Sequence, residues 1–142
     1  MHIRKMVLAD YAAVYELWKN TPGMGLHDVD DSKEGIERFL AHNPDFCFVA
    51  EASGHIAGAI LGGFDGRRGH IYHAAVEPAY RGSGTGKQLL QAVLDAFRQH
   101  KVTKATLVVF KDNEIGNAFW ARAGWTIRPD LNYYGFDLET AD

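Results

Sequence analysis

The segment His70–Gln99 constrains the fold of this chain most strongly, because it passes from a strand pattern through a glycine-rich loop into a helix pattern. Residues 70–76 carry β-branched and aromatic side chains, which are typical of a strand. The loop Glu77–Gly86 follows, and from Lys87 the apolar residues take the spacing of one helix face. That face is formed by Leu89, Leu90, Val93, Leu94 and Phe97. A strand-loop-helix unit is therefore predicted near the centre of the chain.

The glycines of this loop predict an anion-binding site. Gly82, Gly84 and Gly86 let the backbone approach a ligand without Cβ collisions. The free N–H groups at a helix start point toward an anion, and the helix dipole favours negative charge there. Arg81 and Lys87 flank the loop and add positive charge. We interpret the loop as a phosphate cradle, and the alternative is a glycine-rich helix start without a ligand.

Two common phosphate-binding patterns do not fit the loop. The Walker A pattern needs glycine where Arg81 stands and Ser or Thr where Gln88 stands. The dinucleotide fingerprint needs glycine or alanine where Lys87 stands. The pattern Arg81-x-x-Gly84-x-Gly86, after a strand ending in Ala-Val, instead resembles the pyrophosphate loop of the GCN5-related N-acetyltransferase (GNAT) superfamily.

The rest of the chain supplies the other elements of a mixed α/β sheet. We expect strands at 2–7, 46–52, 55–64, 105–110, 125–128 and 133–138, and helices capped by Asp10, beginning near Asp31, and over 113–123. Asp31 and Glu34 have capping-box spacing, and the apolar run 105–110 favours a strand inside the sheet. The order β-α-α-β-β-β-α-β-α-β-β matches the acyl-CoA N-acyltransferase fold of the GNAT superfamily. The resemblance covers residues 1–142 as one domain, similar to small single-domain bacterial members.

The resemblance implies that acetyl-CoA is the co-substrate. Its pantetheine arm would pair with the free edge of residues 74–76, and its pyrophosphate would bind at the loop. Asn113 matches the family residue that hydrogen-bonds the cofactor arm, and Asn117 lies one turn further along. For both asparagines the alternative is a helix-capping or exposed role. The residues assigned to acetyl-CoA are Ala75, Val76, Arg81, Gly82, Ser83, Gly84, Thr85, Gly86, Lys87, Asn113, Asn117 and Trp120.

Trp120 departs from the family pattern, because it occupies the position of a tyrosine that often protonates the departing thiolate. Indole cannot donate a proton in this way, so the role does not carry over. A thiol has a pKa of about 8.5, which makes its thiolate a fair leaving group near neutral pH. Water, Tyr133 or Tyr134 would then supply the proton. We expect Trp120 to pack against the cofactor, the acceptor or the core.

An acceptor amine needs a base, because an alkyl ammonium with a pKa of about 10.4 must lose a proton before it attacks a thioester. The central strand offers Tyr72 and His73, which we expect on opposite faces, with His70 and Glu51 close by. Histidine has a suitable intrinsic pKa for this task. The candidate catalytic residues are His73, Glu51 and Tyr134. The alternative for His73 is a strand histidine packed under a helix.

These observations and the resemblance favour an N-acetyltransferase in which a primary amine attacks acetyl-CoA directly. The alternative is a non-catalytic acyl-CoA-binding sensor or protein-interaction module, and a longer acyl donor also stays open. We expect a small-molecule or peptide amine to enter past Pro22–Asp31, whose acidic residues suit a cation. The resemblance also makes a homodimer through the C-terminal strands an open possibility.

Charge and cysteine content narrow the functional classes. A net charge of -3 with no evident basic face argues against nucleic acid as a partner. The chain contains neither an apolar run of membrane-spanning length nor a signal-peptide pattern, and we expect no membrane partner. The single cysteine, Cys47, lies in an apolar strand pattern and favours a reducing cytoplasm. We expect no metal, because His70 and His73 would point to opposite faces of a strand.

Overall fold

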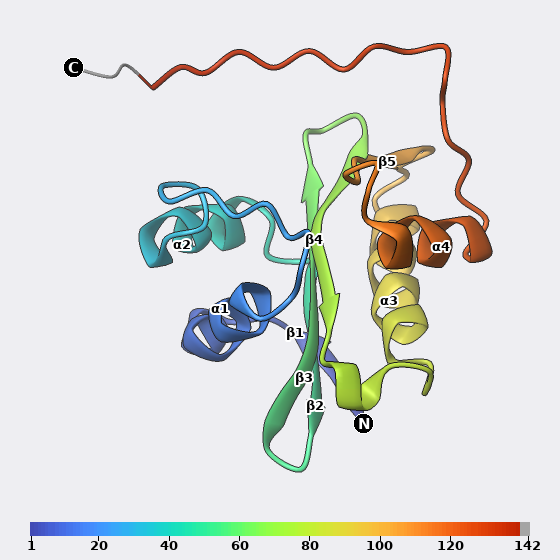
Figure 1. Cartoon of the computed structure of the whole chain (residues 1–142). Helices are drawn as coiled ribbons and strands as arrows, with labels where there is room; N and C mark the ends of the chain where they lie inside the picture. The colour runs from blue at the N-terminus through green and yellow to red at the C-terminus, as the bar shows by residue number, and fades with distance from the viewer. Residues whose placement is uncertain (140–142) are drawn as a thin grey trace.

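The computed structural model describes residues 1–139, which contain one five-stranded sheet in the order β1-β2-β3-β4-β5 (Figure 1). Neighbouring strands are antiparallel except β4 and β5, which are parallel. The strands are β1 (His2–Lys5), β2 (Cys47–Ala52), β3 (His55–Phe64), β4 (Gly69–Val76) and β5 (Ala105–Leu107). Ser53 and Gly54 join β2 to β3 with positive φ angles of 52° and 74°, as the predicted hairpin requires. The mixed α/β fold is confirmed.

Within residues 1–139, four α-helices cover the two faces of the sheet (Figure 1). The helices α1 (Tyr11–Lys19) and α2 (Lys33–His42) lie on one face, and α3 (Thr85–Gln99) and α4 (Glu114–Arg122) lie on the other. Short 3-10 turns precede α1 and α3, at Leu8–Asp10 and Pro78–Tyr80. No helix within residues 1–139 is long and apolar enough to cross a membrane.

The sheet separates two apolar clusters, because consecutive residues of its inner strands point to opposite faces. In β3, Ala59 and Leu61 contact the α1 and α2 side, whereas Ile60 contacts the α3 side. The predicted apolar face of α3 is buried through Leu89, Leu90, Val93 and Phe97. Burial of these side chains stabilises the fold mainly through the hydrophobic effect.

Asp10 occupies the N-cap position of α1 as predicted, but neither Asp10 nor Asp31 supplies a capping side chain to its predicted helix within residues 1–139. The side chain of Asp10 does not cap α1: its carboxylate pairs with Arg4 at 2.8 Å and accepts a hydrogen bond from the Val7 N–H at 2.9 Å. Asp31 does not cap α2 either, because Ser32 is the N-cap and its Oγ accepts from the Gly35 N–H at 3.0 Å. The Asp31 carboxylate is thereby available for contacts elsewhere.

A bulge in β4 overturns the expected side-chain directions on that strand. Ile60 pairs with Ala74 and Gly62 pairs with Ile71, so Leu61 alone stands opposite both Tyr72 and His73. The extra residue shifts the alternation of side chains by one position. Tyr72 therefore packs on Phe39 of α2, with ring centroids 5.3 Å apart, and His73 packs on Trp18 of α1, with centroids 4.8 Å apart. Tyr72 and His73 share one face of the sheet.

The same shift shows that the predicted placement of His70 and His73 on opposite faces of β4 is wrong. The His70 ring lies 4.6 Å from the Tyr72 ring, measured between centroids, so His70 also lies on the face that carries His73. No group of three or more His, Cys, Asp or Glu side chains that could hold a metal occurs in the part of the chain that the structure describes.

The C-terminal part of the chain departs from expectation. β5 is shorter than predicted and lies at the edge of the described sheet, not inside it, and Val108 and Phe110 are exposed. Residues 126–139 contain no helix or strand, so the predicted strands 125–128 and 133–138 are absent from the described residues. This segment leaves α4 as an extended chain (Figure 1). A strand needs a partner for its backbone groups, and the segment has none within residues 1–139.

Candidate functional site: a strand opening and a buried histidine

β4 and β5 separate within the sheet. Their pairing begins at Gly69 and Ala105 and ends at Ile71 and Leu107. Beyond Ile71, the backbone of residues 72–76 has no strand partner on the β5 side within residues 1–139. The opening therefore presents a free backbone edge, which can accept an extended ligand in the place of a strand.

The loop between α1 and α2 reaches across to the segment after β5. A Cβ built on Gly25 would lie 2.9 Å from the Phe110 ring, and one on Gly23 would lie 2.9 Å from Asn113 Nδ2. Both glycines have positive φ, 79° for Gly23 and 65° for Gly25. These positions need glycine for their backbone conformation and for close approach. The loop between α1 and α2 therefore packs closely against the segment that follows β5.

The glycine loop joins the free strand edge to the start of α3. Gly84 is the N-cap of α3 with φ 87°, and no side chain caps the helix within residues 1–139. A Cβ on Gly82 or Gly84 would meet nothing within 4 Å, so open space surrounds both residues. The first-turn N–H groups of α3 are thus left for an external acceptor, and this arrangement fits a pyrophosphate group.

Other residues of the loop maintain its shape. Arg81 Nε donates to the Val76 carbonyl at 3.1 Å, and Ser83 Oγ donates to the Tyr80 carbonyl at 2.5 Å. Thr85 is buried and its hydroxyl lies 3.1 Å from Ser83 Oγ. A Cβ on Gly86 would lie 3.0 Å from the Phe119 ring. Thr85 and Gly86 therefore serve packing in this structure, whereas Arg81 and Lys87 are exposed.

The α4 residues assigned to the cofactor make contacts within the chain. Asn113 Oδ1 accepts from the Gly116 N–H at 2.9 Å, so Asn113 is the N-cap of α4. Asn117 Nδ2 donates to the carbonyls of Phe110 and Asn113 at 3.0 and 2.8 Å. Trp120 packs against the α3-side cluster, with Trp125 centred 5.1 Å away. Asn113 Nδ2 and Asn117 Oδ1 are the atoms left for a ligand.

His73 lies on the opposite side of the sheet, beneath the loop between α1 and α2. Its Nε2 lies 2.8 Å from Asp31 Oδ1, and both side chains are largely buried. The interpretation of Asp31 as a helix cap does not predict this contact. The sequence signal for the correct cap is Ser32, since serine is a preferred N-cap residue and Ser32 precedes Gly35 by three positions.

Glu51 and Tyr134 do not join His73. Glu51 is on β2, which β3 separates from β4, and it lies 3.5 Å from Arg4 Nη2. Tyr134 is 87% exposed in the extended C-terminal segment. The structure thus brings together one of the three candidate catalytic residues and a partner that the sequence did not indicate.

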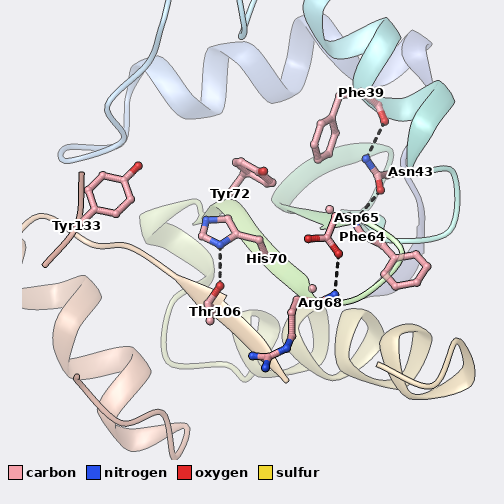
Figure 2. Close-up of a pocket in the computed structure, with 11 residues that line it drawn as sticks. Phe39, Asn43, Phe64, Asp65, Arg68, His70, Tyr72, Thr106 and Tyr133 are labelled. Atoms are coloured by element: carbon pink, nitrogen blue, oxygen red, sulfur yellow. Dashed lines mark hydrogen bonds between the residues drawn. The ribbon is translucent and has the colours of Figure 1, made fainter. Parts of the chain in front are cut away.

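A cavity of about 410 Å³ opens beside Tyr72 on the side of β4 that faces α2 (Figure 2). His70 Nδ1 lies 3.0 Å from Thr106 Oγ1 across the paired ends of β4 and β5. Burial lowers the pKa of His70 from its ordinary value, so its neutral form is favoured at pH 7. The lining residues are Phe39, Asn43, Gly63, Phe64, Asp65, Arg68, Gly69, His70, Tyr72, Thr106 and Tyr133. An aromatic-walled cavity of this size can hold a small organic acceptor.

Known proteins share both the sequence pattern and the fold. A model of the Acetyltransferase (GNAT) family matches residues 11–125. An acetyltransferase of Pectobacterium atrosepticum is 36% identical over 114 residues, covering 80% of this chain and 79% of the relative. The solved structure of PaiA N-acetyltransferase from Thermoplasma acidophilum in complex with coenzyme A has a TM-score of 0.79 at 19% identity, covering 89% of this chain and 90% of that chain. An aminoglycoside 6'-N-acetyltransferase from Acinetobacter haemolyticus has a TM-score of 0.73 at 20% identity, covering 98% and 100%.

In the described part of the chain, β4 and β5 pair only over 69–71 and 105–107, and the glycine loop after β4 ends at a helix start without a side-chain cap. Such an arrangement is suited to a phosphate-bearing ligand along the free strand edge. The chain belongs to the GNAT family of acetyltransferases. The predicted resemblance is confirmed by the family match and by the fold.

Proposed function

We propose that this protein is an acetyl-CoA-dependent N-acetyltransferase of a single domain, residues 1–142. The observation that carries the proposal is the start of α3, which has no side-chain cap within residues 1–139 and which the glycine loop joins to the free edge of β4. Bound acetyl-CoA would supply the activated acetyl thioester. Residues 74–76 would hold the pantetheine arm, and the loop Arg81–Lys87 would hold the pyrophosphate. Asn113 Nδ2 and Asn117 Oδ1 would bind the polar groups of the cofactor between the arm and the pyrophosphate.

The proposed acceptor is a primary amine of a small molecule or peptide that enters on the α1 and α2 side. The exposed Asp28 and Asp30 would attract a cation, and the aromatic wall at Tyr72 would contact its apolar part. His73 is the proposed base, because it lies on this face beside the free strand edge. A backbone N–H near Val76 would stabilise negative charge on the thioester oxygen.

No residue takes the place of the family tyrosine in this proposal. Trp120 packs in the α3-side cluster and Tyr134 is remote, so water is the proposed proton source for the thiolate. The same facts favour the second candidate function, a non-catalytic acyl-CoA-binding module. The two functions differ in turnover, since a module binds acetyl-CoA without consuming it.

A thiol-release assay with acetyl-CoA and a panel of primary amines tests this proposal. We expect amine-dependent release that disappears in an Arg81→Glu, Lys87→Glu variant. The matched control is Lys33→Glu, Arg38→Glu, which makes the same charge change at exposed positions of α2. Binding of acetyl-CoA without release on any amine would instead support the non-catalytic module.

A second copy of the chain is the proposed partner of the C-terminal segment 126–139. The outer edge of β5 has no strand partner within residues 1–139, although Val108 and Phe110 beyond it are apolar and exposed. The segment itself exposes five large apolar side chains by more than 80%: Ile127, Tyr133, Tyr134, Phe136 and Leu138. If the segment 126–139 of each copy paired as a strand with β5 of the other copy, both apolar surfaces would be buried. In an isolated copy these surfaces stay exposed to solvent.

A further inference from the structure

A small polar cluster is buried between α1 and β4. It consists of Trp18, His73 and Asp31, which come from α1, β4 and the loop between α1 and α2. The side chains of His73 and Asp31 are 13% and 8% exposed, and His73 Nε2 lies 2.8 Å from Asp31 Oδ1. Buried polar groups cost free energy unless they are paired, and Asp31 is the partner that makes burial of the His73 ring possible.

Asp31 is held firmly by its own loop and by α1. Its Oδ2 accepts from the His27 N–H at 2.8 Å, and its backbone carbonyl accepts from the Tyr11 hydroxyl at 2.6 Å. Its N–H donates to the His27 carbonyl at 2.9 Å. Burial raises the pKa of Asp31, but the hydrogen bonds from His73 and from the His27 N–H outweigh it and lower the pKa below its ordinary value. Asp31 is therefore an ionised acceptor at neutral pH.

An ionised acceptor at Asp31 determines the tautomer of His73. The carboxylate requires a proton on Nε2, so the neutral ring keeps its lone pair on Nδ1. His73 Nδ1 is buried and has no hydrogen-bond partner within residues 1–139, and the same is true of Trp18 Nε1. Buried polar atoms in folded proteins are nearly always hydrogen-bonded. His73 Nδ1 is thus a basic nitrogen whose lone pair is free within residues 1–139 to accept a hydrogen bond or a proton.

We propose that Asp31 is a positioning residue, which fixes the ring and tautomer of His73 so that Nδ1 accepts a proton from the acceptor amine. This inference rests on the proposed function. The acceptor ammonium first loses one proton to solvent, and Nδ1 then takes a second proton from the neutral amine as the amine lone pair forms the N–C bond. The C–S bond then breaks and its electron pair leaves with the thiolate. Asp31 stabilises the imidazolium, which returns the proton to solvent.

Nδ1 is buried in this structure, so the acceptor or one solvent molecule must reach it when the acceptor binds. Contacts of this kind often tighten only in the complex with substrate. The titratable groups around the ring are Asp31 and His27 in the loop and Tyr11 of α1, whose hydroxyl contacts Asp31. Of these, only Asp31 hydrogen-bonds to the ring within residues 1–139.

Asp31→Asn is the central test, because an amide at this position can donate to Nε2 and thereby move the ring proton to Nδ1. The matched control is Glu37→Gln, which removes one negative charge from an exposed residue of α2. Imidazole ¹⁵N NMR of wild type should show a protonated Nε2 and an unprotonated Nδ1. Asp31→Asn should alter this pattern, and Glu37→Gln should not. A wild-type ring protonated at Nδ1 instead of Nε2 would overturn the inference.

Kinetics supply the second readout. We expect Asp31→Asn to lower kcat roughly tenfold or more and to change the pH profile, with KM for acetyl-CoA unchanged. His73→Gln keeps an amide that can donate to Asp31, so it should keep the thermal stability and lose about 100-fold in kcat. Wild-type kcat in either variant would overturn the positioning role. If wild type turns over no amine, the proposed function fails, and the NMR result still decides the role of Asp31 in setting the tautomer.

Discussion

Gly23 packs against Asn113, the N-cap residue of α4. This contact connects the loop after α1 to the start of α4 across the opening between β4 and β5. The Cβ of any other residue at position 23 would approach Asn113 Nδ2 to 2.9 Å. Asn113 in turn accepts from the Gly116 N–H, so the same side chain orders the first turn of α4. The loop on the proposed acceptor side is thus coupled by contact to a residue on the proposed acetyl-CoA side.

Gly35→Ala should destabilise the protein more than Gly86→Ala. A Cβ on Gly35 would lie 2.4 Å from the Asp30 carbonyl oxygen, which is backbone and cannot rotate away. A Cβ on Gly86 would meet the edge of the Phe119 ring at 3.0 Å, and a side chain can shift. We expect losses of about 3 kcal/mol and about 1 kcal/mol by urea unfolding. Gly135→Ala is the control, because a Cβ there meets nothing within 4 Å.

Arg4→Met should cost far more stability than Lys5→Met on the same strand. Arg4 pairs through two nitrogens with the buried Asp10, which the change would leave unpaired. Lys5 pairs with Asp45 at 2.7 Å, but that pair is largely exposed. We expect about 3 kcal/mol for Arg4→Met and less than about 1 kcal/mol for Lys5→Met. Equal losses in thermal or urea unfolding would contradict the structure.

Cys47 should react with thiol reagents only when the protein unfolds. The thiol is buried, and burial raises its pKa to about 12 from a reference of 9.0. At pH 8 the native protein should be labelled only through its transient opening, and so far more slowly than the unfolded chain. Because the folded pKa is the higher one, the contribution of Cys47 to stability is complete below pH 9 and decreases as the pH rises toward 12. Cys47→Ala should remove this part of the pH dependence between pH 9 and 12, and fast labelling of native protein would contradict the burial.

The strand-loop-helix unit could be predicted from the sequence, because its signals are local. The glycines, the apolar face of α3 and the Ser53–Gly54 turn each depend on neighbouring residues, and the structure has all of them. The bulge in β4 could not be predicted this way. It is defined by the register against β3, where Leu61 stands opposite two residues, and that register involves distant parts of the chain.

The candidate site was predictable only on the side of the glycine loop. Asp31 meets His73 across 42 positions of sequence, and no periodicity reports such a contact. The C-terminal segment shows the opposite case, because its alternation of Tyr134, Phe136 and Leu138 is typical of a strand. Strand propensity depends on an available partner, and residues 126–139 have none within the described chain.

Substitution of the C-terminal apolar residues tests the proposed second copy. Tyr134→Lys, Phe136→Lys should convert a dimer into a monomer, because charge opposes burial of an exchanged strand. Asn132→Lys, at a polar position of the same exposed segment, should leave the dimer intact. Light scattering after size exclusion measures the mass of each variant. A wild-type monomer at every concentration would contradict the exchange.

The most direct test of the central claim is calorimetric titration of the purified protein with acetyl-CoA. The account predicts saturable binding to wild type, binding to Lys33→Glu, Arg38→Glu, and loss of binding in Arg81→Glu, Lys87→Glu. Both double variants carry the same net charge, so the comparison isolates the position of the charges at the start of α3. Absence of heat with acetyl-CoA, CoA and longer acyl-CoAs, or equal affinity in both double variants, would contradict the proposed cradle.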